Sequence, residues 1–247
     1  MAQRTLLQSI QNRSRLLGIQ VPTVVVGSTD PTILQLLECA NEEVKDVANR
    51  EYEFAKLRSS VIFNYGPSVA PFNAFNLETD PLIFGYRSMV PSTFWNTTRR
   101  LPVYGPISDS DWQQMIVMQI SASVDNYRIN GNFVQLYSTL GVANTYSFEY
   151  LSNFAVINSA GTVLQELFAA DTDLPRMPSR IFEAGLLWRW RQLKGQPYAQ
   201  EFEMYEAMLK EEARNEPTST SLKMDYGPHA NNVGPNLAVA IGSWPLP

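Results

Sequence analysis

The sequence is poor in the side chains on which most enzymes depend. Its 247 residues include one histidine, His229, and one cysteine, Cys39. A single histidine argues against a Ser–His–Asp triad or a histidine-ligated metal, and its place beside Pro228 could not hold a catalytic base rigidly. A single cysteine excludes an intrachain disulfide. Neither of the common glycine-rich phosphate-binding loops is present. We therefore expect a protein without catalytic activity, metal ion or cofactor.

Charged residues and long apolar runs are also scarce. Charged residues make up 17% of the chain, against about 25% in typical domains, and the net charge is -5. This balance lacks the basic surface expected of a nucleic-acid-binding protein. No apolar run approaches the roughly 18 residues of a membrane span, and the N-terminus does not read as a secretory signal, so we expect a cytosolic product. Low charge with 11% aromatic residues suits a surface partly covered by other chains, or else a well-packed monomer rich in β-structure.

The first part of the chain is predicted to contain two helices. One spans Thr5–Leu17 and ends at Gly18, a residue type that favours helix C-termini. The second begins at Ser28–Pro31, with capping residues followed by proline, and extends to about Arg50 or Tyr52. Its apolar residues recur every three or four positions and define one face, and its acidic residues fall mostly elsewhere: Glu38, Glu42, Glu43 and Asp46.

The middle of the chain is predicted to be rich in strands. Ser59–Tyr65 has a strand pattern, and six prolines between residues 66 and 107 exclude long helices there. Ser108 precedes a short helix near 109–118 in what resembles a capping box. A hairpin is expected at Tyr127–Leu136 with a type I′ turn at Asn130–Gly131. Strands follow at 145–152, with Tyr146, Phe148 and Tyr150 on one face, and at 154–157.

Helical periodicity returns after residue 178. One helix is expected over 178–194, ending at Gly195, and a second continues through Arg214, so the two should form an αα-hairpin with complementary charges. The expected apolar rows are Ile181, Phe182, Gly185, Leu186, Trp188 and Leu193 on the first helix, and Tyr198, Phe202, Tyr205 and Leu209 on the second. Trp188 should be buried, whereas Trp190 is expected to be partly exposed or to lie in a subunit interface.

This order of elements predicts the α+β class. The helices of residues 1–57 and 171–214 would form an antiparallel bundle. Residues 58–170 would form a β-rich insertion, shaped like a sandwich or barrel because its strands must close on themselves. Residues 215–247 would form an extended C-terminal arm.

Two acidic pairs are candidates for cation binding or acid–base chemistry: Asp171 with Asp173, and Asp109 with Asp111. The remaining ligands of a calcium loop are absent from both. Carboxylates two residues apart in a loop are more often turn and capping groups, the interpretation we favour. Whether Asp171 and Asp173 bind a cation stays open.

The last 33 residues combine five prolines, three glycines and four asparagines with few charges. Fully extended, they could reach about 100 Å. The segment is either simply disordered, as termini often are, or becomes ordered against a neighbouring subunit or partner. Its candidate contact residues are Leu222, Met224, Tyr226, Leu237, Val239, Ile241 and Trp244.

Several strings together resemble the head–tail adaptor proteins of short-tailed bacteriophages, also described as connector, head-completion or upper tail-tube proteins. The resemblance covers about residues 5–226, and its most specific parts are the hairpin and the turn between the last two helices. The strings are Asp30–Leu37, Phe54–Leu57, Tyr104–Trp112, Tyr127–Asn132, Asp171–Asp173 and Leu186–Tyr198.

The resemblance implies a structural protein of the virion, located at the head–tail interface and assembled in the host cytoplasm. Such proteins form a homo-oligomeric ring, expected to be a dodecamer, beneath the portal protein. The helices would line the channel through which double-stranded DNA passes, the terminal arm would engage the portal, and a lower tail (nozzle or tube) protein would bind below, with tail fibres as a further candidate partner. Because phosphate contacts dominate affinity for DNA, we expect acidic residues near the channel, with Glu201, Glu206 and Glu212 as candidates.

Two alternatives belong to other classes. A monomeric carbohydrate- or peptide-binding module would use the β-rich middle as a lectin-like sandwich, with Tyr, Trp and Asn side chains of residues 60–157 as a stacking platform. A hydrolase would depend on Asp171 and Asp173. Particle size separates the first two hypotheses, because a connector forms rings and a binding module stays monomeric.

Overall fold

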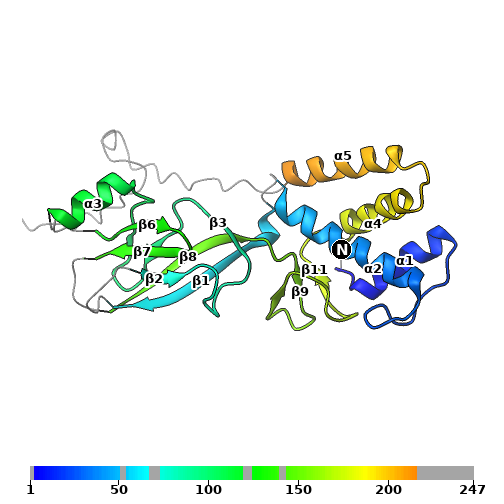
Figure 1. Cartoon of the computed structure of the whole chain (residues 1–247), viewed down its shortest axis with the longest axis horizontal. Coiled ribbons are helices and arrows are strands. Elements are labelled where there is room, and N and C mark those ends of the chain that lie inside the picture. Colours follow the sequence, from blue (N-terminus) through cyan, green and yellow to red (C-terminus); the bar gives the residue numbers. More distant parts are fainter. Residues whose placement is uncertain (1–2, 51–53, 67–72, 119–123, 139–142, 216–247) are drawn as a thin grey trace, which may run out of the picture. The chain divides into compact units, whose positions relative to one another are not determined.

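The chain is described by a computed structural model over residues 3–50, 54–66, 73–118, 124–138 and 143–215. Within these ranges it belongs to the α+β class, with α-helices and antiparallel sheets (Figure 1). The α-helices are α1 (Leu6–Leu17), α2 (Pro31–Asn49), α3 (Asp109–Val117), α4 (Ser179–Leu193) and α5 (Ala199–Asn215), and a 3-10 turn, η1, covers Ala55–Leu57.

The helices begin and end where their capping residues predict. Thr5 and Gln8 form a reciprocal capping box at the start of α1, and Gly18 ends that helix with a φ of 68°. The Asp30 carboxylate accepts the amide of Thr32 at the start of α2. Ser108 caps α3 by accepting the amide of Asp111.

Four of the helices share one apolar core, in which α4 contacts α1, α2 and α5 (Figure 1). The core side chains come mainly from one face of each helix, because apolar residues spaced three or four apart lie on the same side. They include Leu6, Ile10, Leu36, Val44, Phe182, Leu186, Tyr205 and Leu209.

The longest strands, β1 (Arg58–Tyr65) and β8 (Asn144–Ser152), pair antiparallel over their whole lengths. The sheet order is β1–β8–β4–β5, with β3 also on β8; β2–β7–β6 forms a second sheet and β10–β9–β11 a third. The remaining strands are β2 (Asn73–Asn76), β3 (Tyr86–Met89), β4 (Trp95–Asn96), β5 (Leu101–Pro102), β6 (Asn126–Asn130), β7 (Phe133–Tyr137), β9 (Val156–Ile157), β10 (Leu164–Gln165) and β11 (Leu174–Pro175).

The first two sheets bury their inner faces in a second apolar core that is largely aromatic. Alternation along β8 places Tyr146, Phe148 and Tyr150 inward, as predicted, and all three are buried. Phe148 makes edge-on contacts with Phe75 and Phe94 at ring-centroid distances of 5.8 and 5.4 Å. Aromatic packing therefore holds the β-rich part together.

Several local predictions are wrong. The hairpin pairs Asn130 with Phe133, so the turn residues are Gly131 and Asn132; Gly131 has a φ of 57° and Asn132 does not have a positive φ, which excludes type I′. Trp190, expected to be partly exposed or to lie in an interface, is buried because its indole packs in the core. The Lys194 ammonium lies 4.6 Å from the centroid of its ring. Leu193, expected in the apolar row, is 55% exposed because it lies in the last turn of α4, where it lines a surface groove. Tyr198, expected in the row of the next helix, is 36% exposed because it precedes the first residue of α5, Ala199.

Candidate interaction surface

A buried ion cluster joins α2, α4 and α5. The carboxylate of Glu43 is fully buried, accepts Nε of Arg189 at 2.8 Å and accepts the Tyr205 hydroxyl at 2.6 Å. Arg189 also pairs with Asp46 and, at 3.8 Å, with Glu42. Burial raises the pKa of Glu43, although Arg189 and the Tyr205 hydrogen bond favour its ionised form.

Gly185 provides the space for this cluster. A Cβ at that position would collide with the Glu43 carboxylate, so no larger residue fits without moving the cluster. The apolar row on α4 predicted that Gly185 faces inward, but Glu43 was expected to lie off the apolar face of α2. A glycine within the apolar row of a helix was the signal that a facing helix inserts a polar group there.

A second cluster fixes α1 to α4. The buried Glu183 carboxylate accepts Arg4 at 2.7 Å, Arg13 at 3.0 Å and the Asn12 amide at 3.3 Å. The positive charge at α1, from Arg13 and Arg15 within the helix and Arg4 just before it, is therefore partly matched by a single acid on α4. Through the two clusters, α4 binds α2 with a basic side chain, Arg189, and binds α1 with an acidic one, Glu183.

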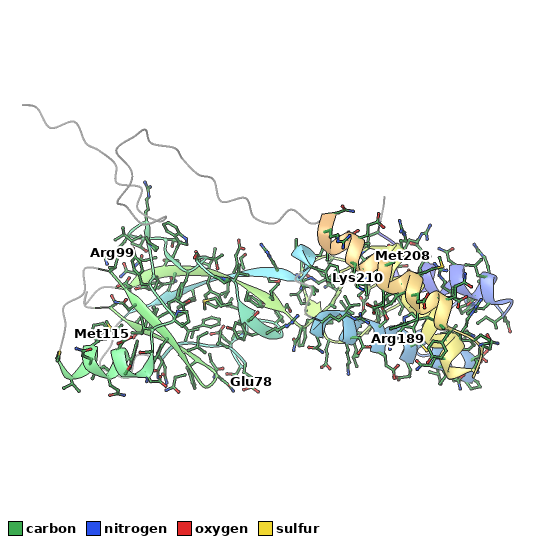
Figure 2. The ribbon with its side chains drawn as sticks, turned by 90° about the horizontal axis from the view of Figure 1, so that it is seen from above. Glu78, Arg99, Met115, Arg189, Met208 and Lys210 are labelled. Atoms are coloured by element: carbon green, nitrogen blue, oxygen red, sulfur yellow. The ribbon has the colours of Figure 1, made fainter. Side chains whose placement is uncertain are left out.

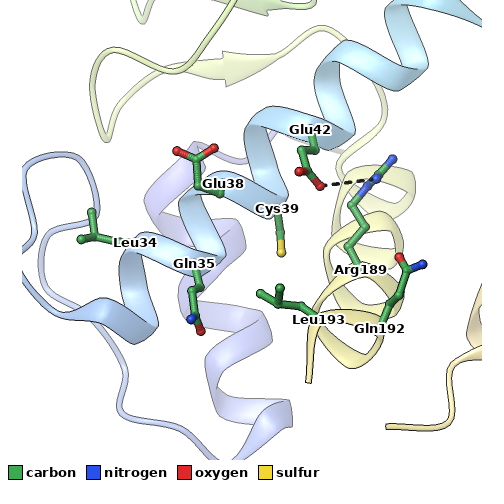
Figure 3. Close-up of a pocket in the computed structure, with 8 residues that line it drawn as sticks. All are labelled: Leu34, Gln35, Glu38, Cys39, Glu42, Arg189, Gln192 and Leu193. Carbon is green, nitrogen blue, oxygen red and sulfur yellow. Dashed lines mark ion pairs between the residues drawn. The ribbon is translucent and has the colours of Figure 1, made fainter. Parts of the chain in front are cut away.

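A groove of about 450 Å³ lies on the surface between α2 and α4 (Figure 3). Leu34 and Leu193 line it and are 42% and 55% exposed, and the Cys39 thiol reaches it from α2. Glu38, Glu42 and Arg189 lie around these apolar side chains (Figure 3). Burial, reinforced by the Glu42 carboxylate, raises the pKa of Cys39 to about 11.

An acidic stripe runs along α2 beside this groove. Glu38, Glu42 and Asp46 recur every four residues, so they lie on one side of the helix, and all three are exposed. Leu34 begins the same row. The outer surface of α2 therefore offers an apolar and an anionic contact next to each other.

The acids proposed to face a channel lie on α5. Glu201 pairs with Arg191 and Glu206 pairs with Arg50, while Glu212 is half-buried. Arg180 of α4 also pairs with Glu211 of α5 at 3.5 Å. This pair and the Arg191–Glu201 pair confirm the predicted complementary charges of α4 and α5, which Figure 2 shows with their side chains. The candidate portal-contact residues lie outside the described part of the chain: Leu222, Met224, Tyr226, Leu237, Val239, Ile241 and Trp244.

Asp171 and Asp173 act as backbone-binding groups. Asp171 accepts the amides of Val25 and Val26 at 3.1 and 2.7 Å. Asp173 accepts the amides of Ala169 and Ala170 at 2.9 and 2.8 Å. These are the contacts of turn and capping carboxylates.

The second acidic pair also has protein partners. Asp109 pairs with Arg128 at 2.9 Å, and Asp111 accepts the Ser108 hydroxyl at 2.7 Å. Among the residues that the structure describes, no three His, Cys, Asp or Glu side chains gather as they would to hold a metal ion. No described helix is long and apolar enough to cross a membrane.

A shallow hollow of about 390 Å³ lies on the outer face of the β1–β8–β4 sheet. Ile62 and Trp95 line it and are 62% and 40% exposed, and Thr93 and Glu149 are among its polar residues. Four of the seven tyrosines between residues 60 and 157 do not contribute to such a surface, because Tyr127, Tyr137, Tyr146 and Tyr150 are buried.

No protein-family model matches this chain, and a comparison with curated proteins also finds no match.

Proposed function

We propose that this chain is a structural virion protein, a head–tail adaptor of a short-tailed bacteriophage. Copies of it assemble into a ring, a dodecamer in the form we propose, below the portal protein. The ring extends the DNA channel and attaches the lower tail proteins. It performs no catalysis and binds no cofactor.

The observation that carries this proposal is the groove between α2 and α4. Leu34 and Leu193 are left exposed there although the helical layer has a complete core of its own. A groove lined by exposed apolar side chains and rimmed by polar groups suits a contact with another protein chain. The helices around it are fixed by the Glu43 and Glu183 clusters, as suits a subunit that docks without rearranging.

The proposed architecture of the subunit follows from the two cores. The helices α1, α2, α4 and α5 form an antiparallel bundle that makes the channel wall, and the strands form a sandwich-like insertion between them in sequence. The segment after Asn215 acts as an arm that contacts the portal through the seven candidate residues named above. Acidic residues of α5, with Glu201, Glu206 and Glu212 as candidates, face the channel, where negative charge keeps the DNA backbone from binding. Glu201 and Glu206 are paired with Arg191 and Arg50 within the subunit, so Glu212 would contribute most of this charge.

Electron microscopy of the purified chain, alone and mixed with its portal protein, tests the proposal. We expect rings in at least the mixture, and we expect the chain among the proteins of the intact virion. A variant ending at Asn215 should still form rings but should bind portal more weakly. A chain that stays monomeric in both samples and is missing from the virion would contradict the proposal.

The hollow around Trp95 favours a second candidate, a carbohydrate- or peptide-binding module. An exposed indole beside hydroxyl and carboxylate groups can stack on a sugar ring and bind its hydroxyls. In that case the protein is a monomer, and a bound ligand raises its melting temperature with the logarithm of ligand concentration above the dissociation constant. Trp95→Ala would abolish that shift and leave the melting temperature of the free protein nearly unchanged.

A further inference from the structure

We propose that the groove between α2 and α4 receives the C-terminal end of α1, residues Arg15 and Leu16, from a neighbouring copy of the chain. The inference rests on the proposed ring and specifies which surfaces form it. In this contact Leu16 enters the apolar part of the groove, and Arg15 approaches the acidic stripe of α2.

The end of α1 has the composition that this contact requires. Leu16 is 70% exposed, more than either leucine of the groove. Arg15 is exposed and makes no ion pair with any residue that the structure describes. The helix contains no acidic residue at all, so its free surface is apolar and cationic.

The groove is complementary in both respects. Leu34 and Leu193 present apolar surface, and Glu38 and Glu42 follow Leu34 along the exposed side of α2. Positive charge lies on the α4 side, where Arg189 pairs with Glu42 and Lys194 contacts Gln35. Glu38 is therefore the acid that a cationic partner would meet. Glu38 makes no ion pair with another described residue, so its charge is available to a partner. A cationic side chain next to a leucine therefore fits this surface better than an acidic or a purely apolar segment does.

The positions of the two surfaces favour a head-to-tail arrangement. Glu183 marks the side of α4 that binds α1, and Gln192, nine residues later, lines the groove. Nine residues are about two and a half helical turns, so Gln192 points away from Glu183. Arg189 and Leu193, which also line the groove, lie about 120° and 80° around the helix from Glu183, so the groove and α1 occupy different sides of α4. A subunit with complementary surfaces on different sides forms rings when the rotation between copies closes.

A twofold dimer through the groove is disfavoured by the same charges. Such a dimer would place a groove against a groove and bring Glu38 and Glu42 near the same residues of the partner. Like charges facing each other across an interface oppose association. The contact is therefore expected to be heterologous, between α1 of one copy and the groove of the next.

Charge reversal tests the pairing directly, using the full chain under conditions in which the wild type forms rings. Arg15→Glu and Glu38→Arg should each weaken association at least about tenfold. The double variant R15E/E38R should recover much of this loss, because every copy then carries the reversed pair. Glu203→Arg, which reverses an exposed acid on α5, is the matched control and should have no effect.

Disulfide trapping gives a second readout that does not depend on affinity. In a Cys39→Ala background, Leu16→Cys with Leu193→Cys should give a ladder of dimers, trimers and larger species on oxidation. A ladder is expected because a head-to-tail contact repeats around the ring. The pair of Leu16→Cys with Met204→Cys is the control, since Met204 is equally exposed, at 53%, on α5.

The outcomes separate this inference from the proposed function. Rings that survive both single charge reversals and give no ladder would overturn the α1–groove contact while leaving the connector function intact. Trapping at dimers alone would replace it with a twofold contact. Failure of the wild type to form rings, alone, with portal or in the virion, would overturn both proposals.

Discussion

The two cores of this protein are built from different interactions. In the helical core, buried carboxylates are satisfied by arginines from other helices, as with Glu43 and Arg189. In the β-rich core, aromatic rings fill the space between the sheets and contact one another edge-on, as Phe148 does with Phe94. The helical core depends on a few specific charged contacts. The β-rich core contains many ring contacts and one buried carboxylate, Asp125, which accepts the Asn96 amide and the Tyr146 hydroxyl.

This difference predicts how the stability of each part responds to substitutions in its core. Removing one partner of a buried ion pair lowers the stability of the fold by more than the intact pair adds to it, because the remaining charge is left unpaired. An aromatic core loses stability in proportion to the apolar volume removed. Helix register should therefore depend on single residues, whereas the β-rich core should respond gradually.

The largest loss is expected on breaking the Glu43 cluster with Arg189→Met. This change keeps most of the side-chain volume but leaves the Glu43 carboxylate buried with only the Tyr205 hydroxyl as a close partner. We expect a loss of about 3–5 kcal/mol in the free energy of unfolding, measured by chemical denaturation. Arg191→Met, two residues along the helix, removes a half-exposed pair with Glu201 and should cost less than about 1 kcal/mol. Equal effects of the two changes would contradict the special role of the buried pair.

The same variant should show a characteristic pH dependence. Because burial raises the folded-state pKa of Glu43 above the unfolded value of 4.5, the protonated form is favoured by folding, and stability is lost as the pH rises through the folded-state pKa. Without Arg189 this pKa rises further, so the penalty of Arg189→Met should shrink as the pH falls from 8 to 5. Denaturation curves of both proteins at the two pH values measure this. A penalty independent of pH would mean that lost packing, rather than an unpaired charge, causes the instability.

The next largest effect is expected for Gly185→Ala. In an ordinary helix this change stabilises by about 1 kcal/mol, because alanine favours helix more than glycine does. Here the added methyl group would collide with the Glu43 carboxylate, so we expect a loss of about 2–3 kcal/mol instead. The sign of the change in melting temperature decides between the two. A stabilised variant would show that Glu43 can move aside without cost.

A graded effect is expected in the β-rich core, smaller than that of Gly185→Ala for a conservative change and as large as that of Arg189→Met only when a whole ring is removed. Phe148→Leu should reduce the free energy of unfolding by about 1–2 kcal/mol, since leucine retains part of the buried volume. Phe148→Ala should reduce it by about 3–5 kcal/mol. An equal loss for both would mean that this core, like the helical one, depends on a specific contact.

The two cores also differ in how far sequence predicts them. Helix limits, the α+β class and the inward face of β8 follow from capping residues and from apolar periodicity, which are local properties. The burial of Glu43 does not follow from such local properties. It depends on Arg189, more than 140 residues later, and on the space left by the missing side chain of Gly185. Its neighbour Glu42, with the same side chain and the same helix, is exposed.

The candidate surface shows the same limit. Leu34 and Leu193 become neighbours only when α2 packs on α4, and the pattern of α4 alone assigns Leu193 to the core. The predicted turn lies one residue too early. Asn–Gly is a strong turn signal, but the pairing of Asn130 with Phe133 places Gly131 and Asn132 in the turn instead. Local patterns thus predict elements well and predict their partners poorly.

The smallest effect, on reactivity rather than stability, concerns Cys39 at the groove. Its thiol pKa rises from 9.0 to about 11, so the reactive thiolate at pH 8 should be about a hundredfold scarcer in the folded protein than in the unfolded one. Native protein should therefore react with a thiol reagent at least that much more slowly than protein in denaturant.

If Arg15 and Leu16 of a neighbour cover the groove, assembled rings should react more slowly still, whereas R15E, which we expect to dissociate, should react at the rate of the free subunit. Equal rates for rings and subunits would place the subunit contact elsewhere on the helical layer.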